Sequence, residues 1–87
     1  MPRLPLPPAH DPRAPFAGWP NWSTWNVHYW LTRNESWSKL ARTMLRRTGG
    51  HVPRAADLMA QALPPRTPDN ARFSRLSLRA ALREFIQ

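Results

Sequence analysis

The sequence predicts an all-α protein: a small bundle of three to four short helices with an extended proline-rich N-terminal arm. Three observations lead to this prediction. Apolar residues recur at helical spacing between residues 22 and 85, seven of the eleven prolines fall within residues 1–20, and no segment alternates like a strand. The 87 residues suit one domain with a thin core.

We expect residues 1–18 to form the arm and residues 19–87 to form the single helical domain. Proline fixes φ and donates no backbone hydrogen bond, so the arm favours polyproline II or flexible chain. Its Pro-x-x-Pro spacings, such as Pro2–Pro5, have the form that aromatic grooves recognise. Such spacings arise easily in any proline-rich stretch, so we expect a flexible arm or one that a partner orders.

Residues 19–30 contain four of the five tryptophans. The first expected helix begins within this segment. Either Ser23 or Thr24 can cap this helix, which should extend to about Thr32. The aromatic side chains either complete the core or form a binding surface. Their helical spacing and the scarcity of other large apolar residues favour the core. Trp19, which precedes the helix, is the best candidate for a partly exposed ring.

The second helix has the clearest pattern. Asn34 is a good N-cap, and Gly49-Gly50 should end the helix. Between them one apolar stripe contains Trp37, Leu40, Ala41, Met44 and Leu45.

A third helix is expected after Pro53 and before Pro64-Pro65. Proline suits the first turn of a helix, and a proline pair prevents its continuation. The apolar stripe of this segment contains Ala55, Leu58, Met59, Ala62 and Leu63.

A fourth helix should start near Ser74 as its cap, after a turn at residues 67–70. We expect Phe73 and Leu76 to fix its start against the core. Its apolar stripe contains Leu78, Ala81, Leu82 and Phe85.

The net charge of +8, from thirteen basic and five acidic residues, predicts a polyanionic or acidic partner. An arginine-rich composition imposed by a GC-rich genome, or simply a solvated face, is the alternative. Only Glu84 lies near the arginines in sequence as a neutralising group. The candidate binding residues are Arg42, Arg46, Arg47, Arg72, Arg75, Arg79 and Arg83, together with Trp19.

The sequence does not favour catalysis, a metal or a cofactor. Its acidic residues are scattered, its three histidines lack metal-ligand spacing, and it has no cysteine. No apolar run approaches the length of a membrane span, and we expect a protein of the host-cell cytoplasm.

Two segments carry a family resemblance. Residues 21–31, followed by Asn34-Glu35, resemble an N-W-x-T-W-N-V-x-x-W signature of small uncharacterised proteins of phages, plasmids and other mobile elements. Residues 67–74 resemble the T-P-D-G-x-x-[FY]-[ST] block of the same family, with Asn70 where glycine is usual. The resemblance covers about residues 19–86 and implies a mobile-element context, in which small proteins often disable host defences.

Two hypotheses of function follow. In the first, the chain is a non-enzymatic inhibitor of the anti-CRISPR or anti-restriction type that docks on a host defence nucleoprotein or its protein subunits. In the second, it binds DNA or RNA directly as a regulatory or accessory protein. A helix-turn-helix is not expected, because residues 48–53 lack a tight turn and the third helix has few polar residues to read bases.

Overall fold

The computed structural model describes residues 14–86, and in this part of the chain four helices and no strand are present. The helices are α1 (Trp22–Arg33), α2 (Glu35–Arg47), α3 (Val52–Ala62) and α4 (Arg75–Phe85). The predicted all-α bundle is therefore confirmed. The predicted arm lies mainly outside the described residues.

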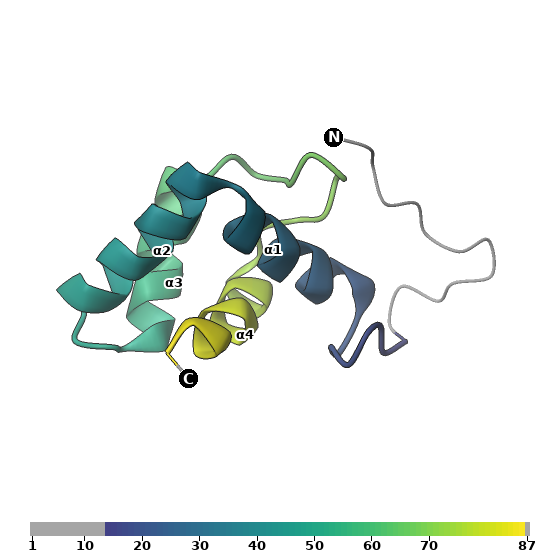
Figure 1. Ribbon diagram of the computed structural model, residues 1–87, viewed down its shortest axis with the longest axis horizontal. Helices are drawn as coiled ribbons and strands as arrows, with labels where there is room; N and C mark the ends of the chain where they lie inside the picture. The colour runs from purple at the N-terminus through teal and green to yellow at the C-terminus, as the bar shows by residue number, and fades with distance from the viewer. Residues whose placement is uncertain (1–13, 87) are drawn as a thin grey trace.

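The four helices form a closed arrangement in which each contacts two principal neighbours. α1 packs on α4 and α2, and α3 packs on α4 and α2. Figure 1 shows α2 and α3 side by side at one end of the molecule, with α4 in the middle and α1 extending toward the other end. The segment between α3 and α4 returns alongside α1.

The helix starts follow from side chains that accept backbone N–H groups. Asn34 Oδ1 accepts from Trp37 N at 3.0 Å, and Ser74 Oγ accepts from Ser77 N at 3.1 Å, as predicted. The predicted cap of the first helix is wrong, because Asn21 takes this position and accepts from Thr24 N at 2.8 Å. The helix therefore begins at Trp22.

The turn between α2 and α3 depends on two glycines and a histidine. Gly49 and Gly50 have φ values of +64° and +82°, and Gly50 N donates to Leu45 O at 2.7 Å. His51 Nδ1 then accepts from Arg54 N at 3.2 Å, so α3 begins just before Pro53. The short turn folds α3 back along α2.

The core is mainly aliphatic, and the predicted apolar stripes of α2, α3 and α4 all contribute to it. The prediction for Leu76 is wrong, because this side chain is 77% exposed. Leu76 lies about 200° around α4 from Leu78, and Leu78 faces the core. Phe73 is buried, as predicted, and holds the start of α4. The wholly buried large apolar side chains are Val27, Leu31, Met59, Leu78 and Leu82.

The tryptophans surround this core rather than fill it. Trp22 is buried, whereas Trp25 and Trp30 are half-buried. The inner face of α1 buries Val27 and Leu31 instead, which leaves the outer face of α1 partly open. The prediction of a tryptophan core is therefore wrong for most of the tryptophans.

Candidate functional site

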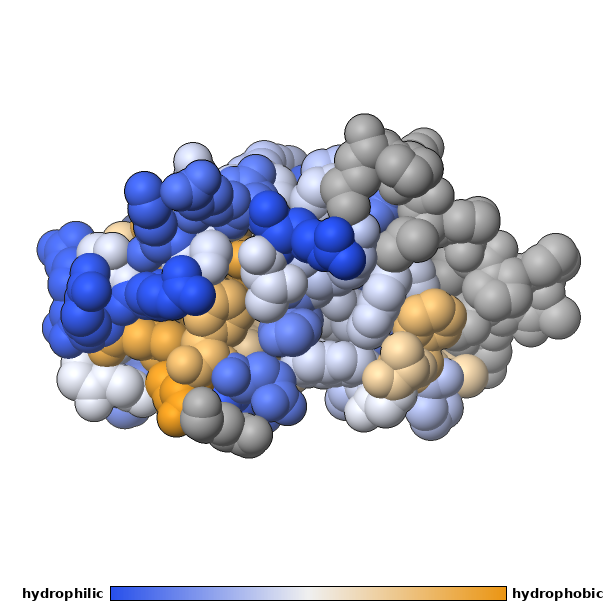
Figure 2. All heavy atoms as spheres, viewed as in Figure 1, coloured by the Kyte–Doolittle hydropathy of each residue, from blue (hydrophilic) through white to orange (hydrophobic). Residues whose placement is uncertain are grey.

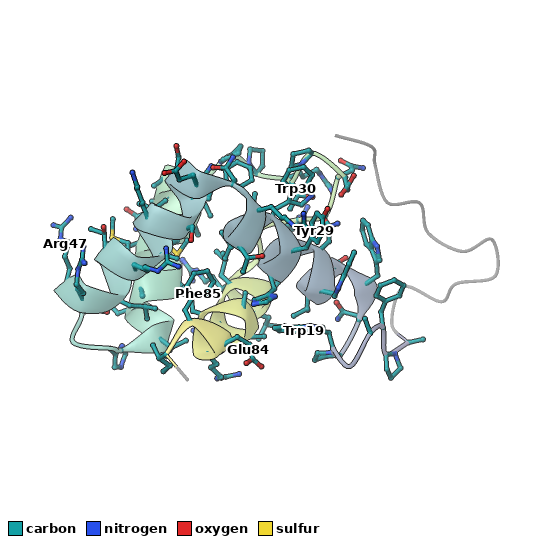
Figure 3. All side chains as sticks on the ribbon, viewed as in Figure 1. Trp19, Tyr29, Trp30, Arg47, Glu84 and Phe85 are labelled. Atoms are coloured by element: carbon teal, nitrogen blue, oxygen red, sulfur yellow. The ribbon has the colours of Figure 1, made fainter. Side chains whose placement is uncertain are left out.

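The three candidate arginines of α2 do not form one cluster. Arg42 Nη1 donates to Ser38 Oγ at 2.8 Å, and its guanidinium lies 5.8 Å from the Phe85 ring centroid. Arg47 follows Arg42 by five residues and therefore points about 140° away around the helix. Arg46 and Arg47 are both exposed, and Figure 3 shows Arg47 at the end of the molecule far from α1.

The arginines of α4 are used in different ways. Arg75 Nε lies 3.1 Å from Asp57 Oδ1 of α3, so this arginine has a carboxylate partner in addition to the Glu84 that lies near it in sequence. Sequence reasoning missed this pair because Asp57 and Arg75 lie on different helices. Arg79 is half-buried, and its Nε has no hydrogen-bond partner among residues 14–86. Arg83 remains exposed.

Five candidate arginines are therefore exposed and without a carboxylate partner within residues 14–86: Arg42, Arg46, Arg47, Arg72 and Arg83. They lie on α2, at the start of α4 and on α4, so they distribute positive charge over several surfaces. Figure 2 shows that hydrophilic side chains cover the outer side of α2. This distribution suits an extended polyanion better than a single bound anion.

One row of aromatic side chains, the Tyr29 row, runs along the outer face of α1 and contains Phe16, Trp25, Tyr29 and Arg33. The Phe16 and Trp25 centroids are 4.9 Å apart, and the Trp25 and Tyr29 centroids are 5.3 Å apart. The Arg33 guanidinium lies 4.8 Å above the Tyr29 ring. Phe16, which the sequence places in the arm, is thus in contact with the helical domain.

A second row, the His28 row, contains Trp19, His28, Phe85 and Arg42. The Trp19 and His28 centroids are 4.7 Å apart, and His28 meets the edge of Phe85 at 6.2 Å. Trp19 is half-buried, which agrees with its predicted partial exposure. Figure 3 shows Trp19 near α4, the helix that contains Phe85, and Tyr29 toward the segment that follows α3.

His28 is the titratable member of the His28 row. Burial lowers the pKa of His28 below its ordinary value of 6.5, and the negative charge of Glu84 opposes this shift. The neutral imidazole is therefore the form that the packed row favours.

A buried polar network joins the two segments that carry the family resemblance. Trp30 Nε1 and Asn26 Nδ2 donate to Asp69 Oδ2 at 2.8 and 3.0 Å. Thr67 Oγ1 donates to Asn26 Oδ1 at 2.6 Å and accepts from Ala71 N at 3.0 Å. These residues lie about forty positions apart, so no local spacing revealed the network. The network gives Asn26, Trp30, Thr67 and Asp69 a structural role.

The turn at residues 67–70 has the predicted chemistry. Asn70 N donates to Thr67 O at 2.8 Å, and Asn70 has a φ of +73°. Asparagine tolerates this conformation, so Asn70 can replace the glycine of the family block.

Within residues 14–86, no group of three or more histidine, cysteine, aspartate or glutamate residues could hold a metal ion. None of the described helices is both long and apolar enough to cross a membrane.

Comparison with protein-family models, with curated proteins and with solved structures finds no match to this chain. The resemblance to small mobile-element proteins therefore stays a prediction from the two signature segments.

Proposed function

We propose that this chain is a small basic binding protein of a phage or plasmid, without enzymatic activity. It inhibits a host defence nucleoprotein complex of the CRISPR or restriction type by docking on that complex. The observation that supports this proposal is the set of exposed candidate arginines without carboxylate partners among residues 14–86, on a chain of net charge +8: Arg42, Arg46, Arg47, Arg72 and Arg83. Such guanidinium groups favour phosphate and carboxylate partners because they make paired, planar hydrogen bonds.

A phage-plating assay tests the inhibitor function. The host carries an active defence system and expresses either the wild-type chain or a variant, and we expect the wild type to raise phage plating. Arg47→Glu and Arg83→Glu should each reduce this effect. Lys39→Glu is the matched control, because it makes the same charge change at an exposed residue that lies 3.6 Å from Glu35. An unchanged plating efficiency with the wild type contradicts inhibition of the defence system used.

Direct binding to DNA or RNA is the second candidate function. It is favoured by the half-buried aromatic side chains Trp25, Tyr29 and Trp30 of α1 and by the Arg33 guanidinium that lies over the Tyr29 ring. A gel-shift assay with duplex and single-stranded oligonucleotides at two salt concentrations separates the candidates. Tight, salt-sensitive binding by the isolated chain favours nucleic acid as the direct target.

A further inference from the structure

The Tyr29 row lies on a face of α1 that does not contribute to the aliphatic core. Its rings lie on the outer face of α1, opposite the side that buries Val27 and Leu31. The row ends in Arg33, an exposed residue in the last turn of α1. An aromatic row that ends in an exposed cation is typical of surfaces that hold a flat ligand.

The geometry at Tyr29 defines where such a ligand would lie. Trp25 lies beside the Tyr29 ring at an interplanar angle of 31°, and Trp30 meets the ring edge-on at 5.6 Å. These two contacts fix the position of the ring. The Arg33 guanidinium lies over the ring, and Arg33 has no carboxylate partner among residues 14–86. The guanidinium can therefore move outward while the ring stays in place.

The His28 row provides an internal comparison. Arg42 also lies over an aromatic ring, that of Phe85, but its Nη1 is held by Ser38 Oγ at 2.8 Å. No such bond holds Arg33 within the described residues. Tyr29 and Arg33 are thus the pair that opens more readily.

We propose that Tyr29 and Arg33 form a clamp for one unpaired nucleobase of a single-stranded nucleic acid. The base inserts between the phenol ring and the guanidinium and stacks on both, which is how proteins commonly hold unstacked bases. The positive charge of the chain attracts the flanking phosphates. A duplex offers no free base face at this position, so single strands are preferred. The inference rests on the proposed function only in that the target contains nucleic acid.

The test is a fluorescence-anisotropy titration with labelled single strands of DNA and of RNA, each of about 12 nucleotides, and with the matching duplex. We expect the single strands to bind more tightly than the duplex. Tyr29→Leu and Arg33→Lys should each weaken single-strand binding about tenfold, whereas Tyr29→Phe should retain it, because stacking needs the ring and the planar guanidinium. Arg54→Lys, the same substitution at an exposed residue of α3, is the matched control.

A second measurement places the base without relying on variants. An oligonucleotide that contains 5-iodouracil should crosslink to Tyr29 or Trp25 on irradiation, and mass spectrometry identifies the residue. Crosslinks elsewhere, equal affinity for duplex, or equal losses for Arg33→Lys and Arg54→Lys would overturn the clamp. An absence of any nucleic-acid binding would also overturn it, whereas the docking proposal would still be decided by the plating assay. Weaker binding of DNA than of RNA, or the reverse, identifies the natural strand.

Discussion

The carboxylate of Asp69 is buried between α1 and the turn at residues 67–70, where Trp30 Nε1 and Asn26 Nδ2 both donate to it. Burying a carboxylate is costly unless hydrogen bonds replace those it made with water. The two donor groups are also removed from water, so they need the carboxylate as their acceptor. The three side chains therefore depend on one another. This dependence gives a structural reason for a tryptophan, an asparagine and an aspartate in the two signature segments.

Replacing Asp69 with alanine should lower the free energy of unfolding by about 2–3 kcal/mol, because Trp30 Nε1 and Asn26 Nδ2 lose this acceptor. Urea denaturation followed by circular dichroism measures the change. Asp57→Ala is the control. The Asp57 side chain is 43% exposed in its ion pair with Arg75, so this substitution should lower the free energy of unfolding by about 1 kcal/mol or less. Equal losses for the two variants would contradict the role given to the buried network.

His28 should make the stability of the domain depend on pH. Burial lowers its folded-state pKa below the ordinary value of 6.5, so the unfolded chain binds the proton more readily. This contribution to stability is fully present above pH 6.5 and is lost as the pH falls through the lower, folded-state pKa. The melting temperature should therefore decrease as the pH is lowered from about 7 to about 5.

The variant His28→Phe retains a ring between Trp19 and Phe85 but cannot bind a proton. Its melting temperature should change less over the same pH range. His51→Asn, which keeps a side chain able to cap α3, is the comparison for the other described histidine. If the wild type and His28→Phe show the same dependence, the effect originates at other groups.

At the scale of the helix, α4 shows that the position of a residue around the helix axis determines whether its side chain is buried. Leu76 and Leu78 are two residues apart, yet Leu76 is 77% exposed and Leu78 is wholly buried. Leu78→Ala should therefore cost about 2–5 kcal/mol, whereas Leu76→Ala should change the free energy of unfolding by less than about 0.5 kcal/mol. Chemical denaturation of this matched pair tests the assignment of the two faces. A large loss for Leu76→Ala would mean that this side chain has a packing partner.

The helices could be predicted because their signals are local. The caps Asn34 and Ser74, the Gly49-Gly50 stop and the apolar stripes each lie within a few residues of the boundary or face that they determine. The cap at Asn21 could not be separated from Ser23 and Thr24, since all three residue types cap well.

The contacts between helices could not be predicted in this way. The ion pair of Arg75 with Asp57, and the network around Asp69, join residues whose proximity depends on the packing of whole helices. The prediction that the tryptophans fill the core is wrong for a related reason. Helical spacing shows that Trp25 and Tyr29 share a face, but both a core face and a binding face have that spacing.

At the scale of the whole molecule, the charge of +8 should act through separate arginines rather than as one uniform field. The guanidinium groups of Arg47 and Arg83 are exposed and available, whereas that of Arg75 is engaged by Asp57. On immobilised heparin, a sulfated polyanion, Arg47→Ala and Arg83→Ala should therefore elute at clearly lower salt than the wild type. Each substitution removes one contact between a guanidinium and a sulfate group. Forming such a contact releases counterions, and this release makes the binding to heparin depend on salt.

Arg75→Ala provides the decisive comparison, because it changes the net charge by the same amount as Arg47→Ala. Its elution should change less, since a sulfate group must displace Asp57 before it can contact Arg75. Circular dichroism of each variant checks that the bundle remains folded. Identical elution shifts for the three variants would show that only net charge determines binding to heparin. The individual exposed arginines would then no longer support the docking proposal.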